Sequence, residues 1–210
     1  MDVTYESPGF ELISFEKSFE LSEHRHAAHC CIYSPYSTPV LNNYVSSALV
    51  SMQMRFDGKI GFHGGLVHEK NITEGLNREL AEEINLNEKF YITDKDYLFT
   101  HVDILNKLCL HFYGKEVSIE DFKTIEKEAL DAEDFGLETM GVFRVPMFTM
   151  RDGYRGLPAF LNNNFIGEAK NQLLNFILHR KLMTPEEVKT VLEHSQKGIL
   201  PRNYHNQIPG

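Results

Sequence analysis

The chain has 210 residues, of which 42% are hydrophobic and 24% charged, a mixture typical of a globular protein built around one well-buried core. Thirty acidic residues against twenty-one basic residues give a formal net charge of −9. This charge excludes broad electrostatic attraction to a nucleic-acid backbone or an anionic membrane. A polyphosphate site would therefore need bound cations or a local cluster of basic side chains.

The cysteines and the amino terminus indicate the compartment. Cys30, Cys31 and Cys109 lack the paired spacing of a disulfide scaffold or a zinc ribbon. The first ten residues have neither the basic nor the apolar region of a signal peptide, and no later stretch approaches about 18 uninterrupted apolar residues. We expect an intracellular protein, not secreted and not membrane-spanning.

The ends of the chain have the weakest pattern. We expect an N-terminal extension over residues 1–22 and a C-terminal tail over residues 199–210, both prone to fray. Residues 23–198 contain no repeat, no low-complexity tract and no linker. They are predicted to form one domain.

Three strands are predicted in the first third of that domain. Residues 29–35 (HCCIYSP) and 44–56 (YVSSALVSMQMRF) are rich in β-branched and apolar residues. Asp57-Gly58 supplies the positive φ of a tight turn. The third strand, residues 59–64, ends at a double glycine.

A helix is predicted from Asn71 to about Ile84. Leu76, Leu80 and Ile84 recur at four-residue intervals and form one apolar stripe. Asn71, with Glu74 three residues later, resembles a capping box. The helix is expected to pack on a sheet.

The remaining elements alternate between strands and helices. We predict a hairpin over 96–105 and 107–117, an acidic amphipathic helix over 119–132 and a strand over 139–148. Two helices follow, one over 165–182 and one that Thr184 caps and Pro185 opens. This order predicts an α/β (α+β) fold, with a mixed sheet sandwiched between helices.

Three carboxylates share one face of the 71–84 helix. At about 100° per residue, Glu79 and Glu83 lie about 40° apart, and Glu82 lies about 60° to the other side of Glu79. Glutamate-rich helices are most often solvated faces. Crowded carboxylates repel one another, however, and a divalent cation with hard oxygen ligands, Mg²⁺ or Mn²⁺, would remove that repulsion.

The surrounding segment, residues 64–86, resembles the Nudix box, in which a glycine precedes the pattern Arg-Glu, apolar, any, Glu-Glu. The matching positions are Gly64, Arg78, Glu79, Leu80, Glu82, Glu83 and Leu86. Longer strings such as SMQMRFDGKIGFHGG and GVFRVPMFTMRDGYRGLPAFLNNNFIG resemble the snoRNA-decapping branch of Nudix hydrolases, which also hydrolyses inosine diphosphate. The similarity runs from about residue 25 to residue 182.

This resemblance implies a Nudix fold and a set of site residues. The implied metal ligands are the Gly64 carbonyl and the carboxylates of Glu79, Glu82 and Glu83, which are also the implied catalytic residues. The implied substrate contacts are His29, Arg55, Phe62 and Gln172. Chemically, Arg55 can fork onto phosphate oxygens and Phe62 offers a face to a purine ring. The resemblance further implies a homodimer located in the nucleus, including the nucleolus, and in the cytoplasm.

The chain departs from the family pattern at three positions. Lys70 stands where a glutamate is expected, so either Glu69 or Glu74 substitutes for it. Asn85 replaces a glycine, a mild change because asparagine tolerates the left-handed conformation. Asn175 replaces a carboxylate that belongs to the metal site of the resembled enzymes, and Glu168 is a candidate replacement that lies off the Asn175 face.

Three functions remain open. The first is hydrolysis of an inosine diphosphate-like nucleotide or a capped RNA, with water attacking phosphorus in line. The second is a binding module that has lost catalysis, and the third is a hydrolase of ADP-ribose or coenzyme-type diphosphates. His63 and His101 are further candidate substrate contacts. RNA-backbone contacts are conceivable at Arg151, Arg155, Arg180 and Lys181.

Overall fold

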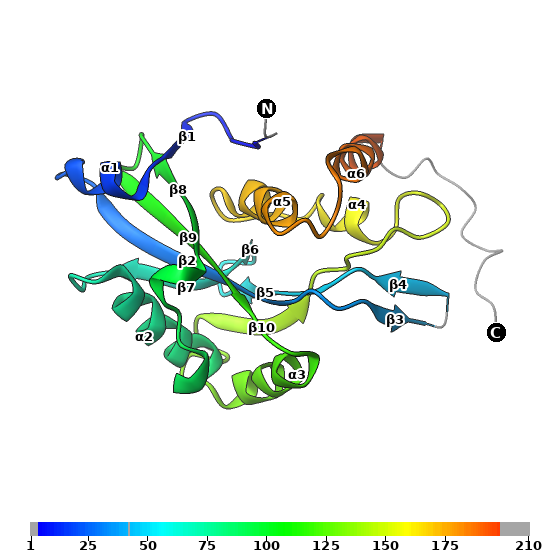
Figure 1. The fold of residues 1–210 in the computed structure, drawn as a ribbon, viewed down its shortest axis with the longest axis horizontal. Helices are drawn as coiled ribbons and strands as arrows, with labels where there is room; N and C mark the ends of the chain where they lie inside the picture. Colours follow the sequence, from blue (N-terminus) through cyan, green and yellow to red (C-terminus); the bar gives the residue numbers. More distant parts are fainter. Residues whose placement is uncertain (1–3, 42, 198–210) are drawn as a thin grey trace.

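The computed structural model describes residues 4–41 and 43–197. The predicted C-terminal tail, residues 199–210, lies outside the described residues. A mixed sheet forms the centre of the molecule (Figure 1), in the order β1-β8-β9-β2-β5-β10 with β7 beside β2 and β6 beside β5. The strands are β1 (Phe10–Ile13), β2 (Arg25–Ser34), β5 (Leu49–Arg55), β6 (Ile60–Gly61), β7 (His63–Val67), β8 (Tyr97–Asp103), β9 (Leu108–Glu116) and β10 (Thr139–Arg144).

The long strand β2 divides the sheet into two branches. Along one edge β2 pairs in parallel with β9, from Arg25 to Tyr33. Along its other edge it pairs first with β7, over His26 to Cys30, and then with β5, over Tyr33 and Ser34. The sheet therefore forks between β5 and β7, close to the double glycine that was expected to lie in the site.

Helices cover both faces of the sheet. Figure 1 shows α2 (Ile72–Ile84) and α3 (Ile119–Glu128) on one face, and α4 (Leu157–Phe160), α5 (Ala169–His179) and α6 (Pro185–Lys197) on the other. Successive side chains of β2 alternate between these layers: Cys30 and Ile32 pack in the α2 core, whereas Cys31 and Tyr33 pack in the α5 core. The predicted mixed sheet between helices is confirmed.

Helix α2 forms where its residues predict it. Leu76, Leu80 and Ile84 are buried, and the side chain of Asn71 accepts a hydrogen bond from the backbone N–H of Thr73 at the first turn. Asn85 ends the helix in the left-handed conformation, with φ of 51°. Its replacement of a glycine is therefore accommodated in the backbone.

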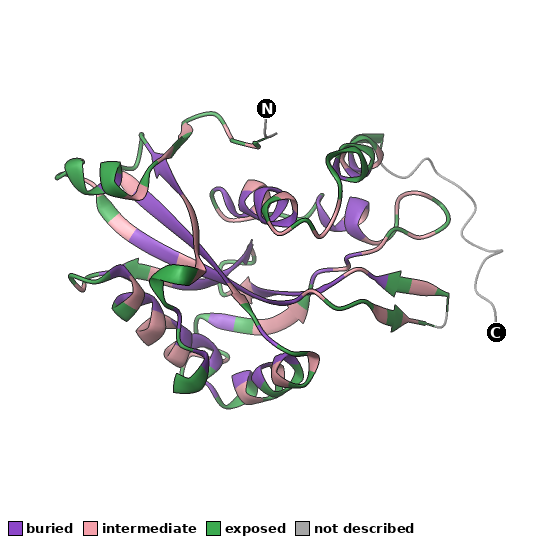
Figure 2. Ribbon diagram, in the orientation of Figure 1, coloured by how far each residue is buried: buried purple, intermediate pink, exposed green. Residues whose placement is uncertain are grey.

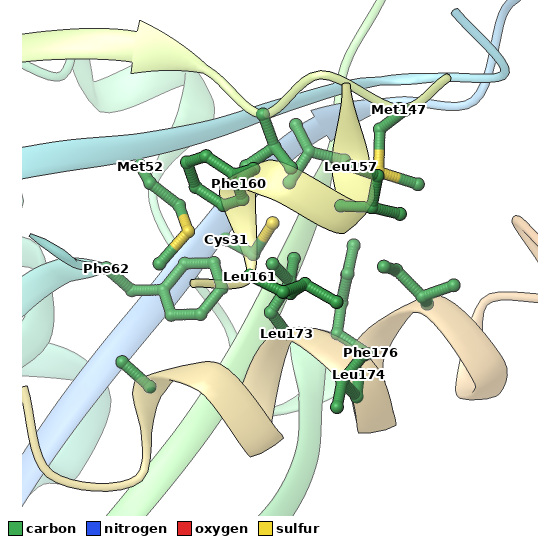
Figure 3. Packing of buried hydrophobic residues seen from close by; sticks show 14 of the residues in the cluster. Cys31, Met52, Phe62, Met147, Leu157, Phe160, Leu161, Leu173, Leu174 and Phe176 are labelled. Atoms are coloured by element: carbon green, nitrogen blue, oxygen red, sulfur yellow. The ribbon is translucent and has the colours of Figure 1, made fainter. Parts of the chain in front are cut away.

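Helix α5 is fixed by the apolar core on the opposite face. Leu173, Leu174 and Phe176 of α5 belong to the same core cluster as Phe62, which comes from the β6–β7 connection on the sheet (Figure 3). Burial is concentrated on the inner sides of the helices and along the central strands (Figure 2). This packing places the first turn of α5 beside the fork of the sheet.

The structure differs from the sequence predictions in several places. The segment 44–56 forms two strands, β4 (Tyr44–Ser46) and β5, and β4 pairs with the unpredicted β3 (Thr38–Val40) in an arm at the edge of the molecule (Figure 1). Within residues 1–22, β1 pairs with β8 and is followed by α1 (Phe15–Glu20), so residues 10–20 contribute regular structure rather than fray. Three short 3₁₀ helices span Glu88–Phe90, Asp94–Asp96 and Ala129–Asp131.

Helix α5, in which apolar residues surround Asn175, is only eleven residues long. No helix in the described parts of the chain has the length and apolar character needed to cross a membrane.

Candidate active site

A groove of about 1090 Å³ runs from α2 across the fork of the sheet to the start of α5. Its wall includes the metal ligands and substrate contacts that the resemblance implies: His29, Arg55, Phe62, Gly64, Glu79, Glu82, Glu83 and Gln172. These residues come from β2, β5, the β6–β7 connection, β7, α2 and α5. The groove also takes in the N-terminal residues Pro8, Gly9 and Phe10.

The double glycine lets the chain pass close to α2. Gly64 has φ of 123°, and a Cβ there would collide with the carbonyl oxygen of Ala28 on the neighbouring strand. A Cβ on Gly65 would collide with the carboxylate of Glu79. Both positions exclude a side chain, so the backbone of β7 can approach the carboxylates directly.

Glu83 is the most buried of the three α2 carboxylates, with 4% of its surface exposed. Its Oε2 accepts a hydrogen bond from the Gly64 N–H at 2.7 Å, and its Oε1 accepts one from the Gln53 side chain at 2.9 Å. Burial raises the pKa of Glu83 to about 7, against the lowering effect of these two hydrogen bonds. The side chain is held in one position on the wall of the groove.

Arg78 holds the other carboxylates. Its guanidinium donates to Glu69 at 2.8 Å, to Glu79 at 2.6 Å and to Glu82 at 2.7 Å. Glu69, not Glu74, therefore takes the place of the glutamate that Lys70 replaces. Hydrogen bonding to Arg78 lowers the pKa of Glu69, whereas burial raises the pKa of Glu79.

Negative charge is in excess at this end of the groove. Six carboxylates, those of Glu69, Glu79, Glu82, Glu83, Asp134 and Glu138, line it beside the guanidinium groups of Arg55 and Arg78. Within residues 4–41 and 43–197, no three acidic, histidine or cysteine side chains already converge as a metal centre; Arg78 lies on Glu79 and Glu82, and Glu83 is engaged by Gly64 and Gln53. The donor set nevertheless fits a hard divalent cation, because such ions prefer carboxylate and backbone carbonyl oxygens.

The walls of the groove formed by β2, the β6–β7 connection and the start of α5 carry fewer charged side chains than the α2 wall. His29 is partly buried, desolvation of its ring lowers its pKa to about 4, and its Nδ1, which is itself buried, has no partner among the described residues. Phe62 is 2% exposed and packs edge-to-face on Phe112 with ring centroids 4.7 Å apart. Glu168, the N-cap residue of α5, and Gln172, in the first turn of that helix, are both buried and complete this wall.

A sequence profile of the Nudt16-like family, described as U8 snoRNA-decapping enzyme-like, matches residues 26–183. The chain belongs to this family. It is 41% identical over 189 residues to the U8 snoRNA-decapping enzyme of Xenopus laevis, covering 88% of this chain and 89% of that protein. It is 35% identical over 165 residues to the Tudor-interacting repair regulator protein of Homo sapiens, covering 77% and 76%.

A third relative, the U8 snoRNA-decapping enzyme of Homalodisca vitripennis, is 47% identical over 137 residues, which cover 64% of this chain and 73% of that protein. This Nudt16-like protein is accordingly a Nudix hydrolase with a Nudix fold, as the resemblance predicted. The decapping relatives are named for an enzyme activity, whereas the Tudor-interacting relative is named for a protein interaction.

Some candidate residues of this Nudt16-like protein do not line the groove. His63 is buried, and its two ring nitrogens lie 2.8 Å from Ser51 Oγ and 3.2 Å from Gln53 Oε1. His101 is buried with both ring nitrogens unpartnered among the described residues. Asn175 binds the N-terminal backbone instead, accepting from Tyr5 N at 2.8 Å and donating to Tyr5 O at 2.9 Å.

The proposed RNA-backbone contacts also lie off the groove wall. Arg155 pairs with Asp152, and Arg180 donates to the Gly114 carbonyl while its guanidinium lies over the Tyr33 ring. These two side chains have structural roles in this Nudt16-like protein.

Sequence reasoning missed the residues that support Glu83. Gln53 joins Glu83 to Thr139, whose hydroxyl donates to Gln53 Oε1 at 2.8 Å. A glutamine in the otherwise apolar core of a strand was the available signal. Asp134 was missed as well; its backbone N–H donates to the Glu82 carbonyl, which joins a distant loop to α2.

Proposed function

We propose that this protein is a metal-dependent hydrolase that cleaves a phosphoanhydride bond in inosine diphosphate-type nucleotides or in the 5′ cap of an RNA. The observation that carries the proposal is the excess of carboxylates on the α2 wall of a groove whose other walls offer the Phe62 ring and the His29 and Gln172 side chains to a base. A pyrophosphate is a polyanion, so it could approach these carboxylates only with cations between them. Glu79, Glu82 and Glu83, with the Gly64 carbonyl, would hold Mg²⁺ or Mn²⁺.

A divalent cation bound there would lower the pKa of a water molecule and balance the charge on the pyrophosphate oxygens. The protein's own groups supply orientation. The Gly64 N–H and Gln53 restrain the Glu83 carboxylate, and Arg78 restrains Glu79 and Glu82. Such supporting contacts fix the rotamers of ligands.

Arg55 is positioned to bind phosphate oxygens from the β5 side of the groove. Its side chain is partly exposed, and its contact with Asp57 is long, at 3.3 Å between Nε and Oδ1. A guanidinium held this loosely can turn onto a bidentate phosphate contact. His29, Phe62 and Gln172 would contact the nucleoside.

The net charge of −9 favours a small nucleotide over a long RNA. The engagement of Arg155 and Arg180 within the protein removes two of the cations that could have contacted an RNA backbone. An RNA would then bind chiefly through its cap. The homodimer and the location in nucleus and cytoplasm stay predictions from the resemblance.

A binding module without catalysis is the second candidate. The Tudor-interacting repair regulator proteins of Gallus gallus and Homo sapiens are 39% and 35% identical to this chain, and their names describe an interaction. Retention of Glu79, Glu82 and Glu83 supports the hydrolase, because mutually repelling carboxylates in a groove are unfavourable without a cation. Hydrolysis of ADP-ribose or coenzyme diphosphates would use the same ligands.

One assay separates these functions. The protein is incubated with Mn²⁺ and inosine diphosphate, ADP-ribose or capped RNA, and release of phosphate or nucleotide is measured. Glu83→Gln should lower turnover on the order of 10²-fold or more. Glu74→Gln is the matched control, because Glu74 is exposed on the same helix and lies off the groove. Absence of turnover on all three substrates would reject the hydrolase in favour of the binding module.

A further inference from the structure

A network of buried polar side chains leads from the sheet to Glu83. Its four members lie on strands β5, β7 and β10: Ser51, Gln53, His63 and Thr139. Ser51 Oγ lies 2.8 Å from His63 Nε2, and His63 Nδ1 lies 3.2 Å from Gln53 Oε1. Gln53 Nε2 in turn donates to Glu83 Oε1 at 2.9 Å. A hydrogen-bonded path therefore joins a carboxylate on the groove wall to side chains that are not part of that wall.

The direction of each hydrogen bond in this network follows from its ends. A carboxylate that ligates a metal is ionised and only accepts hydrogen bonds, so the amide nitrogen of Gln53 faces Glu83 and the amide oxygen faces away. That oxygen has two donors, the Thr139 hydroxyl at 2.8 Å and His63 Nδ1. The His63 ring is fully buried between an amide and a hydroxyl, so it is neutral and carries one N–H. The proton is therefore on Nδ1, and Nε2 accepts from Ser51.

The orientation of the Gln53 amide decides whether it attracts or repels Glu83. If the amide were turned over, its oxygen would face the carboxylate, and two buried acceptors would lie against each other without a proton between them. The contacts that prevent this come from β7 and β10, and both act on one atom, Gln53 Oε1. The Gly64 N–H separately binds Glu83 Oε2 at 2.7 Å. Each oxygen of the carboxylate thus accepts one hydrogen bond from the protein and keeps a lone pair for a cation.

We propose that His63 is a positioning residue for hydrolysis, because its Nδ1–H fixes the Gln53 amide that holds Glu83 in a metal-ligating rotamer. The Thr139 hydroxyl shares this task. The inference rests on the proposed function in that it takes Glu83 to be a metal ligand. His63 acts on the cation only through Gln53 and Glu83. Removal of supporting contacts of this kind changes metal affinity or activity about 10–100-fold.

Two substitutions of His63 separate positioning from packing. The amide nitrogen of asparagine is as many bonds from Cβ as Nδ1 is, so His63→Asn can keep the donor to Gln53. The amide atoms of glutamine are as many bonds from Cβ as Nε2 is, so His63→Gln can match only the contact with Ser51. Asparagine is the smaller residue and leaves the larger void in the core, so His63→Asn should lose more stability. Packing alone predicts the weaker metal site in His63→Asn, whereas positioning predicts it in His63→Gln.

Mn²⁺ binding is measured by calorimetric titration without nucleotide, and urea denaturation is measured on the same proteins. His63→Gln should weaken Mn²⁺ binding about tenfold or more, whereas His63→Asn should stay within about threefold of the wild type despite its lower urea midpoint. Thr139→Val removes the other donor to Gln53 from a strand far in sequence from Gly64, and it should weaken binding about threefold or more. Thr124→Val, at an exposed hydroxyl on α3, is the matched control and should not change binding.

Mn²⁺ affinities that follow the urea midpoints, with His63→Asn the weaker binder, would overturn the inference, and so would a wild type that binds no Mn²⁺. If neither His63 variant folds, Thr139→Val decides, since an affinity equal to that of Thr124→Val would overturn it. Turnover of inosine diphosphate is measured on the same preparations. Affinities in the expected order without turnover would support the role of His63 and reject the hydrolase. Turnover by the wild type with equal Mn²⁺ affinity in all variants would retain the hydrolase and reject the positioning role.

Discussion

The two ends of the groove are built in opposite ways. At the α2 end, carboxylates are crowded, partly exposed and shared among few cations, with Arg78 contacting three of them. At the α5 end, Glu168 and Gln172 are almost fully buried, and each has a polar atom without a hydrogen-bond partner in the described part of the chain. The first end lacks positive charge, and the second lacks hydrogen bonds. A nucleotide with bound cations, the ligand of the proposed function, would supply both.

At the α2 end, the largest loss of stability is expected from Gly64→Ala. The new Cβ would meet the Ala28 carbonyl oxygen in a backbone conformation that disfavours alanine. We expect a loss of about 2–5 kcal/mol in the free energy of unfolding, measured by urea denaturation. Gly58→Ala is the control, since Gly58 has φ of 76° but nothing within 4 Å of its Cβ position, and it should lose about 1 kcal/mol. Equal losses would contradict the close approach at Gly64.

Arg78→Lys tests whether the shared guanidinium sets the position of the acids. A lysine is a point charge and cannot contact Glu69, Glu79 and Glu82 at once. We expect kcat/KM on the preferred diphosphate to fall about 10–100-fold, with little change in unfolding free energy because the side chain is 38% exposed. The control is Arg144→Lys, which breaks a comparable pair with Glu126 away from the groove. Similar kinetics in both variants would show that Arg78 is not a positioning residue.

A smaller effect, on the pH dependence of stability, is expected from His111 in strand β9. His111 is buried against α1, with Thr100 Oγ1 and His26 Nδ1 each 2.9 Å from its ring nitrogens, and burial followed by His26 lowers its pKa to about 3. The unfolded chain binds a proton at this residue below about pH 6.5 and the folded chain does not, so stability is lost as the pH falls from about 6.5 towards 3. This residue should contribute about 2 kcal/mol to the loss between pH 7 and pH 5.

His111→Gln removes this titration while it keeps hydrogen-bonding groups at the site. Urea denaturation at pH 7 and pH 5 should show a shallower decline in stability for the variant than for the wild type. Parallel declines would contradict the lowered pKa. Because His111 does not line the groove, the preference between nucleotides at pH 7 should not change.

Helix α2 and the shared face of its carboxylates could be predicted from the sequence because the necessary information is local. The stripe Leu76, Leu80 and Ile84, the Asn71 cap and the carboxylate spacing all belong to one helix. The choice between Glu69 and Glu74 stayed open because it depends on how the loop after β7 folds back, and only the contact with Arg78 decides it.

The α5 end was less predictable because its contacts join distant parts of the chain. Glu168 acquires its orientation from Ser7, 161 positions away. Strand β1 was missed for the same reason: Phe10 to Ile13 form a half-exposed edge strand without clear alternation, stabilised by pairing with β8. The division of 44–56 into β4 and β5 likewise depends on partners, since β4 pairs with β3 and β5 with β2 and β10.

Asn175 stands where the resembled enzymes have a metal-site carboxylate, and here its amide clasps both backbone groups of Tyr5. In place of a metal-site carboxylate, this position carries an amide that links the N-terminal segment to helix α5. Trimming the protein to Phe10 would therefore discard Pro8 and Gly9 from the groove wall and release Glu168 from Ser7. In preparations shortened or cleaved in this way, base selectivity should drift even where the hydrolytic carboxylates are intact, so ligand preferences need to be measured on protein with a native leading segment.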